Sequence, residues 1–119
     1  MKITLLFLGK TKAEYQSAIE NFQKKLRPFC ELEIKVLKDE KVHRDIGKVL
    51  KKEEKRILET LSEREFLIVL DEKGKIFDTL NFSQWISSTS SQVGSLTFLI
   101  GSSYGLSEAM KKRANLLLS

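Results

Sequence analysis

The stretch of the sequence best suited to chemistry is FLIGSSYGLS, residues 98–107, where an apolar run stops at Gly101 and Gly105 follows. A glycine at the end of a strand lets a ligand approach the backbone closely, and the amides and hydroxyls of the two serines that follow can donate hydrogen bonds. The spacing is neither that of a dinucleotide-binding loop nor that of a phosphate-binding P-loop. The segment therefore predicts a ligand cradle or, as the alternative, a tight strand-to-helix turn with Ser107 as N-cap.

A second polar segment, DEKGK at residues 71–75, follows the apolar run LIVL. In open α/β sheets, ligands bind beyond the carboxyl ends of the strands, and functional side chains often lie on such connections. Asp71 and Glu72 are therefore candidate site residues. The alternative is a turn whose carboxylates form only local hydrogen bonds.

Cys30 and His43 are the single cysteine and the single histidine of the chain. One cysteine cannot form an internal disulfide, which fits a reducing compartment. One cysteine and one distant histidine cannot make a structural zinc site, so we expect no bound metal. A nucleophilic Cys–His pair has no supporting motif, and a small core thiol with a loop imidazole is favoured.

Apolar runs of strand length alternate with amphipathic stretches of helix length. We expect strands over residues 3–8, 31–38, 66–70, 95–100 and 116–119, the second near a sheet edge and the last in the centre of the sheet. We expect helices over residues 12–27, 45–61, 81–88 and 107–114, with a turn at 71–75 and a Ser-rich loop at 87–95. This order predicts an α/β fold, an open and mostly parallel sheet with helices on both faces.

Three of the expected helices carry apolar residues at helical spacing. The predicted inward-facing sets are Tyr15, Ala18, Ile19, Phe22 and Leu26; then Ile46, Val49, Leu50, Ile57, Leu58 and Leu61; then Phe82, Trp85 and Ile86. Opposite the second set lie Lys48, Lys51, Lys52, Lys55 and Arg56. The net charge of +5 favours an anionic partner such as nucleic acid. This basic face is either a phosphate-binding surface or a solvated helix face.

The length of 119 residues and the hydrophobic fraction of 41% correspond to one globular domain. The apolar runs are shorter than the roughly 20 residues of a membrane span. The first ten residues lack the long apolar region of a signal peptide. We therefore expect a cytoplasmic protein without membrane segments.

Three segments together resemble one protein family: MKITLLFLGK at the start, LIVLDEKGK in the middle and FLIGSSYGLS near the end. By their order and spacing, the chain is identified as a member of the ribosomal RNA large subunit methyltransferase H family, of the SPOUT class of knotted methyltransferases. The resemblance implies a trefoil-knot α/β fold and a cytoplasmic homodimer. It also implies that S-adenosyl-L-methionine (SAM) serves to methylate N3 of a pseudouridine in 23S rRNA within the ribosome.

The same resemblance implies the cofactor-binding residues. Leu70 and Gly101 match family positions that contact SAM, and Ser102 and Gly105 lie on the rim of the same cradle. The family usually has a second glycine where this chain has Ser102, a mild change because the side chain is small. No catalytic residue is assigned.

The resemblance further implies a Thr-x-Pro-His segment and a final helix after LLLS, which supply the third cofactor loop, the knot and much of the dimer interface. We therefore expect residues 1–119 to be a single SPOUT-like domain, incomplete at the C-terminus, with the knot segment truncated. Such a chain should fold marginally, self-associate through exposed apolar surface, bind SAM weakly and transfer no detectable methyl group. The alternative function is a basic α/β domain that binds ribosomal RNA or a nucleotide without chemistry.

Overall fold

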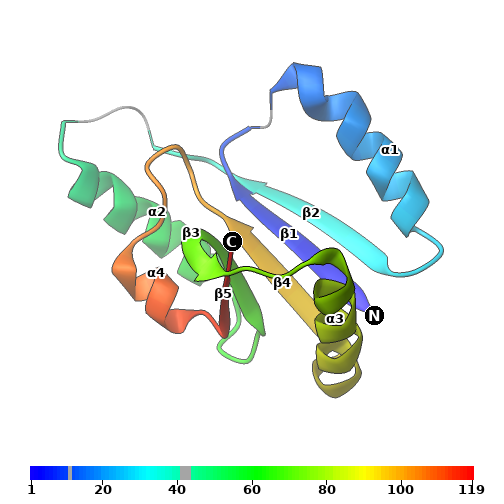
Figure 1. Ribbon diagram of the computed structural model, residues 1–119. Helices are drawn as coiled ribbons and strands as arrows, with labels where there is room; N and C mark the ends of the chain where they lie inside the picture. Colours follow the sequence, from blue (N-terminus) through cyan, green and yellow to red (C-terminus); the bar gives the residue numbers. More distant parts are fainter. Residues whose placement is uncertain (11, 41–43) are drawn as a thin grey trace.

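The computed structural model describes residues 1–10, 12–40 and 44–119, which form a five-stranded sheet with helices on both faces (Figure 1). The strands are β1 (Lys2–Leu8), β2 (Glu31–Leu37), β3 (Leu67–Lys75), β4 (Ser95–Ile100) and β5 (Leu116–Leu118). The helices are the short 3₁₀ turn η1 (Ala13–Tyr15), α1 (Gln16–Leu26), α2 (Ile46–Thr60), α3 (Thr79–Val93) and α4 (Glu108–Arg113). The predicted alternation of strand and helix is confirmed.

The strand order is β2-β1-β4-β3-β5, and each pair of neighbouring strands in the described residues is parallel. The predicted open parallel α/β sheet is confirmed, as is the edge position of β2. The expectation that β5 lies centrally is wrong, because within the described residues β5 forms the other edge. Leu117 packs against the apolar core on one face of the sheet and Leu118 belongs to the core on the other. The unbroken apolar pattern of LLL therefore indicates that β5 is covered on both faces of the sheet. It does not indicate that β5 lies in the centre of the strand order.

The core has two layers, one on each face of the sheet. On one face α2 and α4 supply Ile57 and Met110, which pack with Leu6, Leu8, Leu67, Val69, Leu99 and Leu106. On the other face α3 packs Phe82, Trp85 and Ile86 against Ile68, Leu96 and Phe98. The predicted inward set of α3 is thus confirmed, and its Phe82 and Trp85 rings stack with centroids 6.3 Å apart.

Helix α3 is longer at both ends than the predicted 81–88. Asn81 and Gln84 have the sequence spacing of a capping box, which predicts that they cap this helix, and this prediction is wrong. The helix is capped by Asp78, whose Oδ1 accepts a hydrogen bond from the Asn81 amide at 2.7 Å.

The Ser-rich segment predicted as a loop at residues 87–95 is helical as far as Val93. Ser90 Oγ donates to the Ser87 carbonyl at 3.2 Å, and Ser91 Oγ donates to the Ser88 carbonyl at 2.7 Å. Hydroxyls bonded to the preceding turn let serine stay within a helix, although its propensity is low. The helix stops at Gly94, whose φ of 77° belongs to the left-handed region.

Helix α1 ends before Pro28, as predicted, but its predicted burial is wrong. Phe22 is 62% exposed, and of the five predicted inward residues only Ile19 is half-buried. In Figure 1, α1 stands apart from the sheet beside β1 and β2. Cys30 lies in the turn after α1 and is half-buried, whereas His43 lies outside the described residues.

Candidate functional site

One pocket of about 500 Å³ is lined by residues 70–72 of β3 and by the carboxyl end of β4 with the turn that follows it. The candidate residues from both motifs line it, namely Leu70, Asp71, Glu72, Gly101, Ser102 and Gly105. Parallel neighbouring strands place their carboxyl ends at the same sheet edge, and β3 pairs directly with β4. Two motifs that lie about 30 residues apart in the sequence are therefore brought together at one pocket.

The wall formed by residues 101–106 is itself a tight turn. The Gly105 amide donates to the Ser102 carbonyl at 2.9 Å, and Gly105 has a φ of 81°. Ser107 is the N-cap of α4, as predicted, since its Oγ accepts from the Met110 amide at 3.3 Å. The two alternatives left open by the sequence are thus compatible, because a tight capped turn also lines a pocket.

Gly101 is required by the loop's own backbone. A Cβ at this position would lie 2.7 Å from the Gly105 carbonyl oxygen and 2.8 Å from Leu106 Cγ. Side chains essentially never make such close contacts with backbone, so a larger residue would displace the turn. The glycine that we interpreted as making room for a ligand first makes room for the turn.

Ser102 does not offer its hydroxyl proton to the pocket. Its Oγ donates to Oε1 of Glu53 on α2 at 2.8 Å, and a hydroxyl has one proton to donate. Sequence analysis missed Glu53, which is 1% exposed. The sequence does contain a pattern that indicates its burial. Glu53 lies midway between Val49 and Ile57 at helical spacing, and so on the inward-facing stripe of the helix.

The end of β3 departs from the predicted turn at residues 71–75. The strand continues to Lys75 with an irregularity, since Leu70 and Lys75 both lie opposite Leu118 of β5. Gly74 allows this close approach, because a Cβ there would lie 2.6 Å from the Leu118 amide nitrogen. The prediction of a turn that ends the strand at residue 70 is wrong, because Lys75 pairs again with β5, while residues 71–74 form the irregularity between the two pairings.

Asp71 forms an ion pair across the pocket instead of the local hydrogen bonds we considered. Its Oδ2 lies 3.9 Å from Nζ of Lys111 on α4, and both side chains are partly buried. The pocket lining thus includes two carboxylates, from Asp71 and Glu72, and the ammonium group of Lys111. Apolar side chains, among them Leu70 and Leu106, complete the wall.

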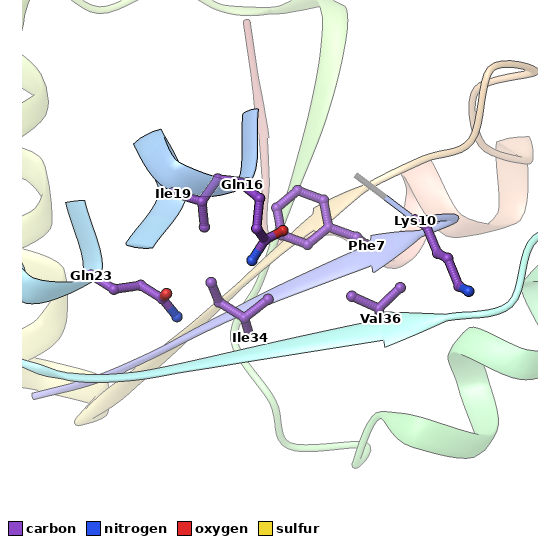
Figure 2. Close-up of a pocket in the computed structure, with 7 residues that line it drawn as sticks. All are labelled: Phe7, Lys10, Gln16, Ile19, Gln23, Ile34 and Val36. Atoms are coloured by element: carbon purple, nitrogen blue, oxygen red, sulfur yellow. The ribbon is translucent and has the colours of Figure 1, made fainter. Parts of the chain in front are cut away.

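A second cavity, of about 590 Å³, lies between α1 and the sheet (Figure 2). Figure 2 shows Ile19 and two glutamines of α1 facing Ile34 and Val36 of β2 and Phe7 of β1. The cavity exists because α1 stands off the sheet. Among its described lining residues the only charged group is Lys10, so it offers a weaker basis for chemistry than the pocket at the strand ends.

Four of the five residues predicted to form the basic face of α2 are exposed to solvent. Lys48, Lys51, Lys52 and Lys55 are exposed. Arg56 is not part of this face, because it pairs with the Glu40 carboxylate and donates to the Lys38 carbonyl at 2.9 Å. The phosphate-binding interpretation therefore concerns the four lysines alone.

Residues 1–10, 12–40 and 44–119 contain no group of three or more His, Cys, Asp or Glu side chains placed to hold a metal ion. None of the helices that the structure describes is long and apolar enough to cross a membrane.

The whole chain, residues 1–119, matches the family model described as "Predicted SPOUT methyltransferase". Curated relatives named ribosomal RNA large subunit methyltransferase H match along the entire chain. The protein from Natranaerobius thermophilus is 43% identical, with 79% of its length covered. The Streptococcus mutans protein is 41% identical with 79% covered, and the Pseudothermotoga lettingae protein is 35% identical with 78% covered.

A parallel α/β sheet with a pocket at its carboxyl edge, together with these matches, defines a methyltransferase. The chain belongs to the SPOUT methyltransferase family, in the branch that contains the ribosomal RNA large subunit methyltransferase H proteins. The family identified from the three sequence motifs is confirmed.

Proposed function

We propose that this protein is a SAM-dependent methyltransferase that modifies N3 of a pseudouridine in 23S rRNA of the large ribosomal subunit. The observation that carries the proposal is that one pocket is lined both by LDE (residues 70–72) of β3 and by GSSYG (residues 101–105), which follows β4. Relatives named ribosomal RNA large subunit methyltransferase H support the substrate class.

The residues that line the pocket fit SAM in size and charge. A volume of about 500 Å³ lies within the usual range for small-molecule sites. SAM would supply a methyl group on a positively charged sulfur, and the pocket lining carries the carboxylates of Asp71 and Glu72 against the one ammonium group of Lys111, so the net charge of these groups is negative. We propose Leu70 and Gly101 as cofactor contacts, with Ser102 and Gly105 holding the rim.

The task of the chain's own residues is positioning. Methyl transfer needs donor and acceptor held in line, and the N3 proton of the base must leave. The hydrogen-bonded turn 101–106 and the part of β3 around Leu70 would orient one partner, while the four exposed lysines of α2 would attract the phosphate backbone of the other. We further propose that the protein works in the cytoplasm as a homodimer, as the family resemblance implies.

Two measurements test the proposal. Calorimetry with the chain should show binding of SAM, and tritium from methyl-labelled SAM should pass to ribosomes when the product of the whole reading frame is added. Binding without transfer would favour the alternative of an inactive ribosomal RNA-binding domain. If the protein neither binds SAM nor transfers the methyl group, the proposal is refuted.

A further inference from the structure

The turn that forms one wall of the pocket is held from behind by a buried carboxylate. Glu53 lies on α2 and is 1% exposed, and acidic residues are almost never fully buried without partners. Its Oε1 accepts from Ser102 Oγ at 2.8 Å, and its Oε2 accepts from the Glu40 amide at 3.0 Å. Both oxygens are therefore satisfied by segments outside the helix.

Ser102 passes this restraint to the turn. Its Oγ accepts from the Tyr104 amide at 3.4 Å, and its carbonyl accepts from the Gly105 amide at 2.9 Å. The connection thus runs from Glu53 through Ser102 into the backbone that lines the pocket. Glu53 is not itself among the residues that line the pocket.

We infer that Glu53 is a positioning residue of the cofactor site, which acts through Ser102 to hold residues 101–106 in their binding form. A loop ordered before binding loses less conformational entropy when the ligand arrives, so loosening the loop weakens affinity. The identity of the ligand, SAM, rests on the proposed function. The ordering of the turn is a property of the ligand-free chain.

A neighbouring contact supports this role for α2. Ser107 Oγ donates to Glu54 Oε1 at 2.6 Å, so consecutive residues of one helix hold both ends of the turn. Of the two carboxylates, Glu53 is the buried one. Water does not replace a buried hydrogen bond when it is lost. Substitution of Glu53 should therefore have a larger effect on the turn than substitution of Glu54.

The variant is Glu53→Gln, which keeps the size of the side chain. The amide accepts only through its oxygen, so if it keeps the bond from the Glu40 amide, its nitrogen must donate to Ser102 Oγ. That reverses the Ser102 bond and removes the charge that strengthens it. The dissociation constant for SAM, measured by calorimetry, should rise by about tenfold. In a Ser102→Ala background the same change should add less than about twofold, because the two residues act through one bond.

A hydroxyl–carboxylate pair at the other end of β4 provides the matched control. Thr97 is 6% exposed, and its Oγ1 donates to Glu65 Oε2 at 2.9 Å. Thr97→Val should lower the melting temperature as Glu53→Gln does, with SAM affinity unchanged within about twofold. If both variants weakened SAM binding equally, the loss of affinity would follow from general destabilisation of the fold. That result would overturn the inference.

Amide hydrogen exchange of the ligand-free chain separates this inference from the proposed function. Glu53→Gln should speed exchange at Gly105, whereas Thr97→Val should not. If the parent chain fails to bind SAM, the proposed function fails and the exchange result alone decides the positioning role. Exchange at Gly105 equal to that of the parent overturns the role, whatever SAM binding shows.

Discussion

Helices α1 and α2 each follow a strand and carry apolar residues at helical spacing, but they meet the sheet differently. α2 buries Val49, Glu53 and Ile57 and holds the pocket-lining turn through Ser102. Helix α1 contributes no fully buried residue among those described and leaves a cavity above β1 and β2. The amphipathic pattern shows that a helix has an apolar face, and the packing partner decides whether that face is covered.

The largest expected difference concerns packing. Ile57→Ala should lower the free energy of unfolding by about 2–5 kcal/mol, because Ile57 is 0% exposed and its removal leaves a cavity. Ile19→Ala on α1 should lower it by about 1 kcal/mol or less, since Ile19 is only half-buried. Urea unfolding measures both values. Equal losses would mean that α1 packs as tightly as α2 in solution.

The second prediction concerns the turn that α2 supports. Gly101→Val should weaken SAM binding by about 100-fold, equivalent to about 2.7 kcal/mol, because the side chain would collide with the Gly105 carbonyl. It should also destabilise the fold.

Gly94→Ala is the control for Gly101→Val. Gly94 has a positive φ, and no atom lies within 4 Å of an added Cβ. Its substitution should lower stability by about 1 kcal/mol and leave calorimetric SAM affinity unchanged. If Gly101→Val bound SAM as the parent does, the turn would not be part of the site.

The third prediction compares the two helices as RNA-binding surfaces. Replacing Lys48, Lys51, Lys52 and Lys55 of α2 by Glu should weaken ribosome association by more than about tenfold and lower its salt dependence by about 3 in logarithmic slope. The control replaces four exposed basic residues on and beside α1, Lys12, Lys24, Lys25 and Arg27, which removes the same charge. Filter binding across a salt series distinguishes the sets, and equal slopes would mean that only total charge matters.

The smallest effects are expected for the ion pairs. Glu33→Gln should cost less than about 0.5 kcal/mol, because Lys2 Nζ lies 3.3 Å away and both side chains are well exposed. Glu40→Gln should cost about 1 kcal/mol, since its pair with Arg56 is partly buried and tied to the chain before α2. Chemical denaturation tests the ranking. A larger loss for Glu33→Gln would contradict the view that the α2 side is the more tightly held.

The sequence by itself determined the element order, the parallel α/β class, the family and the two motifs that line the pocket. These follow from local patterns: buried strands are unbroken apolar runs, and Ser107 caps α4 next to its own strand end. The SAM contacts and the dimer stay predictions.

Only the tertiary structure decided the rest, because each remaining feature depends on a partner far away in the chain. The exposure of Phe22 depends on where α1 stands. The conformation of residues 71–75 depends on their pairing with β5. The position of β5 at the edge of the sheet depends on its pairing with β3. Glu53 and Ser102 are separated by 49 positions, and no local pattern connects a glutamate on a helix stripe to the serine whose hydroxyl donates a hydrogen bond to it.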